Sequence, residues 1–242
     1  MTRPPSLDQA AASAVLIVKP DRLYAEALRE LTLRAFPAAD VRLASTLEHA
    51  RAALRTAAVD VLVTGVGASL GGDVIDFLAR CAGQSDWARR VLVVTTHQEL
   101  RILVALRTLP IQGVFDSTAE PPEEFLGAIR TVARGGHYWS HSLLERLRRL
   151  SSRGDALPRL LTTSEQLVLS VIGGGSDNAS AARELGLSPA TISSVRRELH
   201  RKLGVQHRGD LIRIAAQSGF VQFAPSGVIR PGFGMLTAAY EA

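Results

Sequence analysis

The chain has 242 residues, 46% of them hydrophobic, with 28 basic and 23 acidic side chains and a formal net charge of +5. This length and composition favour two domains with packed cores, and no apolar run approaches the ~20 residues of a membrane span. Because residues 11–18 lack the basic leader and cleavage pattern of a signal peptide, we expect a cytoplasmic protein. The single cysteine, Cys81, excludes an internal disulfide.

Residues 14–137 alternate short apolar runs with amphipathic segments, after an expected flexible tail at residues 1–13. The apolar runs, which are typical of buried parallel strands, are 15–18, 41–44, 61–64, 91–95 and 113–115. The expected helices are 22–35, 47–57, 74–81, 99–109 and 123–134. Five such βα units predict an α/β domain with a doubly wound, five-stranded parallel sheet, whose ligand crevice lies at the carboxyl ends of the strands.

Residues 138–157 are expected to form a linker. Residues 138–150 have a partly helical pattern with several arginines on its polar side, and residues 151–155 have the composition of a flexible tether. A solvated connector helix is the simpler interpretation. The alternatives are a lever that transmits the state of the first domain and an additional patch that contacts phosphate.

Residues 158–218 contain four helical patterns, at 163–172, 178–185, 191–205 and 208–217, which predict an all-α four-helix domain. A tight break separates the second pattern from the third. Ser188 is a suitable N-cap there, and Pro189 suits the first helical position because its missing N–H costs nothing. Two helices that meet at such a turn are typical of a helix-turn-helix motif.

The third of these helices is amphipathic. Its apolar stripe points toward a small core and consists of Ile192, Val195, Leu199 and Leu203. Ser193, Ser194, Arg197 and Arg201 project the other way, toward a groove of DNA if DNA is bound. Arg197 is the leading base reader, because arginine pairs bidentately with guanine whereas serine discriminates bases weakly. The plainer alternative is a solvated basic face on an ordinary helix.

The excess positive charge lies in the second half of the chain. Residues 14–137 carry as many acidic as basic side chains, whereas residues 138–219 carry a surplus of basic ones. Such a surplus attracts DNA in a salt-sensitive way and positions the protein, but it does not specify a sequence.

The helix-turn-helix segment resembles the LuxR-type DNA-binding domain between residues 161 and 216. The matching residues are Leu161, Thr162, Glu165, Val168, Leu169, Asn178, Ala182, Leu185, Leu187, Ser188, Thr191, Ile192, Arg201, Lys202, Leu203, Gly204 and Val205. The resemblance implies that the third helix enters the major groove. It implies DNA-binding roles for Asn178, Thr191, Ser193, Ser194, Arg197, Arg201 and Lys202, of which Ser193, Ser194 and Arg197 face bases and Thr191, Arg201 and Lys202 lie near phosphates.

The same resemblance implies a dimer formed by the last helix, with Arg208, Leu211, Ile212 and Ala215 at its interface. The chain departs from the LuxR-type pattern at Ser193, where a basic residue is common, and at Val195, where histidine is common. These departures leave the base preference open.

The first domain resembles the receiver domain of NarL/FixJ-type response regulators over residues 14–137. In that family an acidic pair holds Mg²⁺, an aspartate accepts a phosphoryl group, and a Thr/Ser and a lysine complete the site. The matching positions here are Lys19, Pro20, Gly65, Thr95 and Ser117. Only Thr95 keeps the family's residue type, so the site is degenerate.

These replacements remove the chemistry of phosphorylation. Glycine offers no oxygen nucleophile, and neither a lysine nor a proline can replace two carboxylate ligands of Mg²⁺. We therefore expect neither a metal nor a cofactor. One alternative is a rearranged acidic site built from Asp21, Asp73 and Asp116. Another is that Lys19 pairs with one of these carboxylates across the crevice.

The expected function is sequence-specific DNA binding by a transcription regulator that is not an enzyme and acts independently of aspartyl phosphorylation. The expected partners are double-stranded DNA, a second copy of the chain, and a regulatory protein or small ligand at the receiver-like domain. The alternatives are a phosphorylation-switched response regulator and an interaction partner that does not bind DNA. Residues 219–242 form a tail that either docks on a domain or is disordered.

Overall fold

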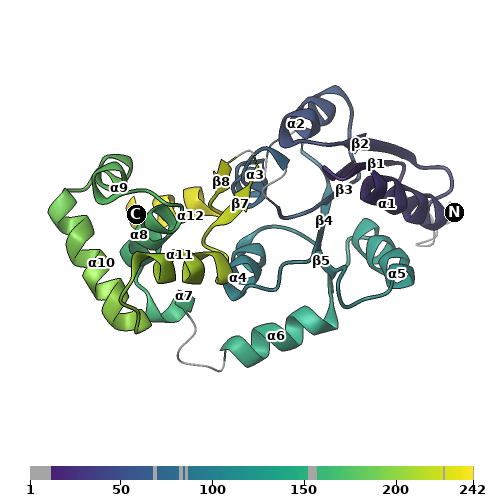
Figure 1. The fold of residues 1–242 in the computed structure, drawn as a ribbon. Helices are drawn as coiled ribbons and strands as arrows, with labels where there is room; N and C mark the ends of the chain where they lie inside the picture. Colours follow the sequence, from purple (N-terminus) through teal and green to yellow (C-terminus); the bar gives the residue numbers. More distant parts are fainter. Residues whose placement is uncertain are drawn as a thin grey trace, which may run out of the picture. The chain divides into compact units, whose positions relative to one another are not determined.

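The computed structural model describes residues 12–67, 70–81, 84, 87–151, 157–225 and 227–241 (Figure 1). By their contacts these residues form two compact units. The first comprises the described residues up to 66 together with 81–96 and 110–142, and the second comprises those in 67–80, 97–109 and 143–241. Most of the expected amino-terminal tail and of the expected tether lies outside the described residues.

A parallel sheet forms the centre of the first unit. Its strands are β1 (Ala14–Val18), β2 (Asp40–Ala44), β3 (Val61–Thr64), β4 (Arg90–Thr95), β5 (Gly113–Asp116) and β6 (Tyr138–Trp139). They lie in the order β2-β1-β3-β4-β5-β6. The doubly wound parallel sheet is confirmed, but it has six strands rather than five. The sixth pairs Gly113 with Tyr138 at the edge of the sheet, where a linker helix was expected to begin.

The helices of the first unit cover both faces of this sheet. They are α1 (Arg22–Ala35), α2 (Leu47–Thr56) and α5 (Pro122–Ala133). α1 packs beside α5 over one face, where Leu28 and Phe125 join the buried side chains of the strands. α1 connects β1 to β2 on one side of it, and α2 leads from β2 back to β3 on the other side of β1. Because the two connections run in opposite directions along the sheet, right-handed crossovers place α2 on the other face. Asp21 begins α1, because its carboxylate accepts a hydrogen bond from the Tyr24 N–H at 2.8 Å.

The second unit is mainly helical. Its helices are α3 (Val74–Cys81, of which the last residue falls in the first unit), α4 (Leu100–Thr108), α6 (His141–Ser151, most of it), α7 (Leu157–Leu160), α8 (Thr163–Gly173), α9 (Asn178–Leu185), α10 (Pro189–Leu203), α11 (Arg208–Gln217) and α12 (Phe233–Glu241). The hairpin strands β7 (Gln222–Ala224) and β8 (Gly227–Ile229) precede α12. The core of the helix-turn-helix part includes Val168, Ile192, Leu199, Leu211 and Phe220. Among the described residues, no helix has the length and apolar character needed to cross a membrane.

The carboxyl-terminal segment docks within the second unit. α12 packs on α8, and Phe233 joins the core of the helix-turn-helix part. The Asp76 carboxylate of α3 accepts hydrogen bonds from the N–H groups of Gly234 and Met235, which are unpaired donors at the start of α12. Of the two expectations for this tail, docking is therefore the one that the structure shows.

Buried Arg101 of α4 also binds the carboxyl-terminal segment. Its guanidinium donates to the carbonyl oxygens of Gly219 and Pro231 and lies 4.7 Å from the centroid of the Phe220 ring. Sequence reasoning missed this residue, although an arginine at the start of the apolar helix α4 was a detectable signal. These contacts explain why α3 and α4 group with the second unit although the sequence suggested a boundary near residue 137.

Candidate functional sites

The turn between α9 and α10 has the local chemistry that the sequence predicted. Gly186 ends α9 in the left-handed region, with φ of 64°, and the Leu187 N–H donates to the Ala182 carbonyl. The Ser188 hydroxyl then accepts the Thr191 N–H at 3.0 Å and Pro189 occupies the first turn of α10. The two helices are thus held at a short, doubly capped turn.

α10 presents two different faces. Ile192 and Leu199 are fully buried in the domain core, whereas Ser194, Arg197 and Arg201 are exposed. Within the described part of the chain, no hydrogen bond or ion pair engages the Arg197 guanidinium. Its five N–H donors are therefore available to a ligand.

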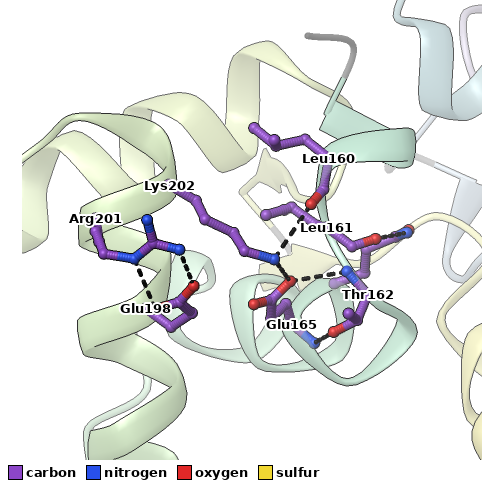
Figure 2. Close-up of polar contacts among 8 residues, drawn as sticks. Leu160, Leu161, Thr162, Glu165, Glu198, Arg201 and Lys202 are labelled. Carbon is purple, nitrogen blue, oxygen red and sulfur yellow. Dashed lines mark hydrogen bonds and ion pairs between the residues drawn. The ribbon is translucent and has the colours of Figure 1, made fainter. Parts of the chain in front are cut away.

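Arg201 is exposed but engaged within its own helix. Its guanidinium bonds the Glu198 carboxylate one turn earlier, with one N–H donating at 2.9 Å (Figure 2). This pairing raises the pKa of Arg201. An exposed pair of this kind contributes little to stability and exchanges readily for another anion.

Lys202, expected to lie near phosphate, is bound inside the domain. Its ammonium lies 2.9 Å from the Glu165 carboxylate and 3.4 Å from the Leu160 carbonyl oxygen (Figure 2). Glu165 belongs to the capping box of α8, where it also accepts the Thr162 N–H at 2.8 Å. Burial opposes ionisation of Glu165, but these partners lower its pKa below the ordinary value. In this arrangement Lys202 connects α10 to the start of α8 instead of reaching outward.

Two other predicted DNA-binding residues are partly engaged with each other. The Asn178 amide donates to the Ser193 hydroxyl at 2.9 Å, and its carbonyl oxygen accepts a hydrogen bond from Arg196 at 3.1 Å. These bonds fix α9 against α10. Thr191 is exposed at the start of α10, with its hydroxyl 2.8 Å from that of Ser188.

The predicted dimer interface on α11 is only partly on the surface. Leu211 and Ala215 are fully buried in the domain's own core, and a Cβ at Gly173 would come within 2.4 Å of the Ala215 Cβ. α11 therefore packs tightly on α8 through these residues, and their side chains are not available to a second copy. Arg208 and Ile212 remain at least partly exposed, so pairing through α11 stays a prediction for them alone.

In the crevice of the first unit, Lys19 occupies the space beside Gly65. A Cβ at Gly65 would lie 2.9 Å from the Lys19 Nζ, so the two positions matching the metal ligand and the phosphoacceptor are in contact. The ammonium donates to the Val94 carbonyl oxygen at 2.9 Å and lies 4.5 Å from the centroid of the Tyr24 ring. Lys19 is only 9% exposed, and this burial lowers its pKa to about 8.

The hypothesis that Lys19 pairs with a carboxylate across the crevice is not supported. Within the described residues Lys19 forms no ion pair, and Asp21 instead caps α1. The buried Asp116 carboxylate accepts hydrogen bonds from the Thr118 N–H and the Ser142 hydroxyl, each at 2.9 Å. Asp73 lies in the other unit.

Thr95 and Ser117 do come together at the carboxyl ends of β4 and β5. The Ser117 N–H donates to the Thr95 carbonyl oxygen at 3.0 Å, and its hydroxyl approaches the same oxygen at 3.3 Å. Pro20, which follows Lys19 in the sequence, is exposed. The part of the chain that the structure describes contains no cluster of three side chains suited to hold a metal ion.

Comparison with known proteins supports both halves of this description. Residues 159–215 match the family described as bacterial regulatory proteins, luxR family. The transcriptional regulatory protein MctR of Rhizobium johnstonii is 35% identical over 99 residues, which are 41% of this chain and 45% of MctR. The chain spans about half the length of the first curated relatives that it matches.

Longer matches have lower identity. The methanol utilization control regulatory protein MoxX of Paracoccus denitrificans is 28% identical over 85% of this chain and 92% of its own. A structure of RcsB from Salmonella enterica serovar Typhimurium bound to promoter rprA has a TM-score of 0.57 and 22% identity, and the match covers 84% of this chain and 97% of RcsB. Residues 159–215 therefore match the luxR family of bacterial regulatory proteins, and the chain is similar in fold to RcsB.

Proposed function

We propose that this protein is a sequence-specific DNA-binding transcription regulator that acts independently of aspartyl phosphorylation. The observation that carries the proposal is the exposed face of α10, where Arg197 has no partner within the described chain and lies beside exposed Ser194. This face stands on a helix whose opposite side is locked into a core through Ile192 and Leu199. Rigid support of this kind is what groove reading needs, because base contacts depend on precise placement.

The side chains of α10 take different roles in this proposal. Arg197 reads a base edge in the major groove, and bidentate pairing favours guanine. Arg201 exchanges Glu198 for a backbone phosphate, and Thr191 donates to phosphate from the first turn of the helix. Lys202 holds the domain together, and Asn178 and Ser193 first serve to position α10 against α9.

The active species is proposed to be a homodimer in the cytoplasm, bound to double-stranded DNA. Paired recognition helices then read half-sites about one helical turn apart. The relatives named above carry regulatory names, and the RcsB structure was determined on a promoter, which supports this assignment by likeness. We assign no catalytic activity to the chain.

Independence from phosphorylation is supported by the crevice of the first unit. The position matching the phosphoacceptor is Gly65, which has no side chain to receive a phosphoryl group. The neighbouring space is filled by the Lys19 side chain, whose ammonium bonds a backbone oxygen. A metal that neutralises transferred phosphate would have to displace a cation there, which electrostatics opposes.

Binding of untreated protein to DNA tests the proposal. Purified full chain is incubated at low salt with fragments of its own genome, and bound fragments are sequenced after a gel shift. We expect recurrent sequences with a two-fold repeat, bound without any phosphodonor. Uniform retention of all fragments, or retention of none across a range of protein concentrations, would contradict sequence-specific binding.

A further inference from the structure

A cavity of about 520 Å³ lies between α1 and α5 within the first unit. Its floor is formed by Leu28, Phe115 and Phe125, which are buried members of the sheet's core. The volume lies within the range of about 300–1,000 Å³ that is typical of sites for small molecules, and mainly apolar walls are typical of them as well. The cavity is therefore a preformed site of ligand size.

The cavity is elongated along α1. That helix contributes Tyr24, Ala27, Leu28, Leu31 and Arg34, which follow one another at helical spacing on one face. Ten residues separate the first from the last, and at 1.5 Å per residue this is a length of about 15 Å. A ligand that fills the cavity is accordingly long and narrow.

The charged side chains around the cavity differ in what they bind. Glu30 lies 3.7 Å from Arg29 on the outside of α1, and the Glu120 carboxylate accepts hydrogen bonds from Tyr138 and Ser140, both at 2.7 Å. Arg34 also lines the cavity, and no hydrogen bond or ion pair of its guanidinium is found among the described residues. The lining thus offers one cation that is available to a ligand.

The opposite end of the cavity reaches the degenerate site. Tyr24, Thr96 and Ser117 line it there. The Tyr24 ring also lies under the Lys19 ammonium, and Ser117 occupies the position that matches the family's lysine. A ligand in the cavity would therefore contact the side chains that hold the crevice in its present arrangement.

We propose that this cavity binds a small, elongated and largely apolar carboxylate. The carboxylate pairs with Arg34, the apolar body lies over Leu28, Phe115 and Phe125, and the far end lies near Ser117. A charge-assisted bond to the guanidinium orients the molecule, and apolar burial supplies affinity. The idea that this ligand replaces phosphorylation as the regulatory signal rests on the proposed function. Binding of the ligand to the cavity does not.

Calorimetric titration of the full chain with decanoate tests the site. Ala27→Trp places an indole inside the cavity from an exposed helix position, and Ala38→Trp makes the same change in an exposed turn outside it. We expect saturable binding to the wild type and to Ala38→Trp, and at least about tenfold weaker binding to Ala27→Trp. Equal binding of decanoate to all three proteins, or no binding of either decanoate or 2-naphthoate to any of them, would overturn the proposal.

Two comparisons test the role of charge. Arg34→Gln should weaken decanoate about tenfold or more, as expected for the loss of a hydrogen bond between charged groups, and should leave the binding of uncharged decanol unchanged. The matched variant is Arg29→Gln, which changes an arginine of α1 that does not line the cavity, and it should bind both compounds normally. 2-Naphthoate in place of decanoate distinguishes an aromatic acid from an aliphatic one, and binding of either supports the site. Loss of decanol binding in Arg34→Gln would contradict the assigned role of Arg34.

The same proteins separate this inference from competing explanations. If the wild type dimerises and Ala27→Trp is monomeric in sedimentation experiments, with no decanoate bound by either, the cavity is a contact between copies and the proposal fails. Gel shifts on these samples report the proposed function independently. Decanoate binding without DNA binding would support the ligand site and contradict the proposed function. DNA binding without decanoate binding would contradict the ligand site alone.

Discussion

The crevice of the first unit and the exposed face of α10 differ in where they place positive charge. In the crevice, Lys19 is buried, bonds a backbone oxygen and has a lowered pKa. On α10, Arg197 is exposed and has no partner within the described chain. A buried cation that is satisfied internally closes a site to a metal, whereas an exposed one is available to an incoming anion. This difference is what the proposed function requires of the two sites.

The same contrast appears between neighbours on α10. Lys202 is enclosed against Glu165, and Arg201 one residue earlier is paired only on the surface (Figure 2). Lys19 and Lys202 are the two lysines of the sequence, and both serve internal packing. The charged contacts with DNA are therefore proposed for arginine, whose planar guanidinium suits phosphate and guanine better than an ammonium does.

Among the substitutions that test this comparison, replacement of Lys19 should have the largest effect on stability. Burial disfavours the charged form of Lys19 and lowers its pKa from 10.5 to about 8. The folded state therefore binds fewer protons than the unfolded state between these pH values. Lys19→Met keeps the shape without the charge and should raise the free energy of unfolding at pH 7 by up to about 3 kcal/mol, less the cost of the hydrogen bond that the Val94 carbonyl loses. Urea denaturation measures it.

The pH dependence provides the control for this variant. Wild-type stability should rise as the pH increases from about 8 toward 10.5, because the unfolded chain still holds the proton that the folded one has lost. Lys19→Met should lack this contribution. A less stable Lys19→Met at pH 7 would mean that the ammonium stabilises the crevice, contrary to the account.

Replacement of Lys202 should have the next largest effect. Lys202→Met leaves the buried Glu165 carboxylate without its cation, although the Thr162 N–H still bonds it. We expect the free energy of unfolding to fall by about 1–3 kcal/mol. Arg201→Met, the neighbouring change at an exposed pair, should leave the denaturation midpoint unchanged within error. Similar losses of unfolding free energy in both variants would contradict the conclusion that Lys202 supports the fold and Arg201 does not.

Replacement of Asp73 should have a pH-dependent effect on the stability of the second unit. Burial raises the pKa of Asp73 to about 7, repulsion from Asp76 adds to this, and hydrogen bonds from the N–H groups of Gly232 and Ile75 oppose it. The folded state therefore holds a proton that the unfolded state releases near pH 4, and stability falls as the pH rises from about 4 to about 7.

Asp73→Asn should flatten this part of the stability profile. Relative to the wild type, the variant should gain stability progressively across that pH window, with most of the gain present by pH 7. The Glu198→Gln variant, on the exposed side of α10, is the control and should follow the wild-type slope. Parallel profiles for Asp73→Asn and wild type would show that Asp73 is ionised in the folded protein throughout this range.

Elements with strong local signals were predictable from the sequence, and those that depend on distant partners were not. The cap Ser188 and the periodicity of α10 act within a few residues, and the structure confirms them. The two-residue strand β6 has no periodicity to detect and exists only because it pairs with β5. Docking of α12 likewise depends on Asp76, which lies 158 residues from Gly234 in sequence.

The same division applies to the candidate sites. The exposed positions of Ser194 and Arg197 followed from helical spacing alone. The enclosure of Lys202 did not, because Glu165 lies 37 residues away and a basic residue near a helix end looks the same whether it faces a phosphate or a carboxylate. Leu211 and Ala215 match positions of a dimer helix, but tight packing of α11 on α8 at Gly173 decides that they face inward.

Fluorescence anisotropy on one fragment recovered by the genomic selection tests the central claim most directly. Untreated wild type and protein incubated with acetyl phosphate and Mg²⁺ should bind with the same affinity and salt dependence, and mass spectrometry should find no added phosphoryl group. Arg197→Ala should bind about 10–100-fold more weakly, and Arg107→Ala, an exposed arginine on α4, should bind normally. Tighter binding after acetyl phosphate treatment with a phosphoryl adduct, or unchanged binding by Arg197→Ala, would contradict the account.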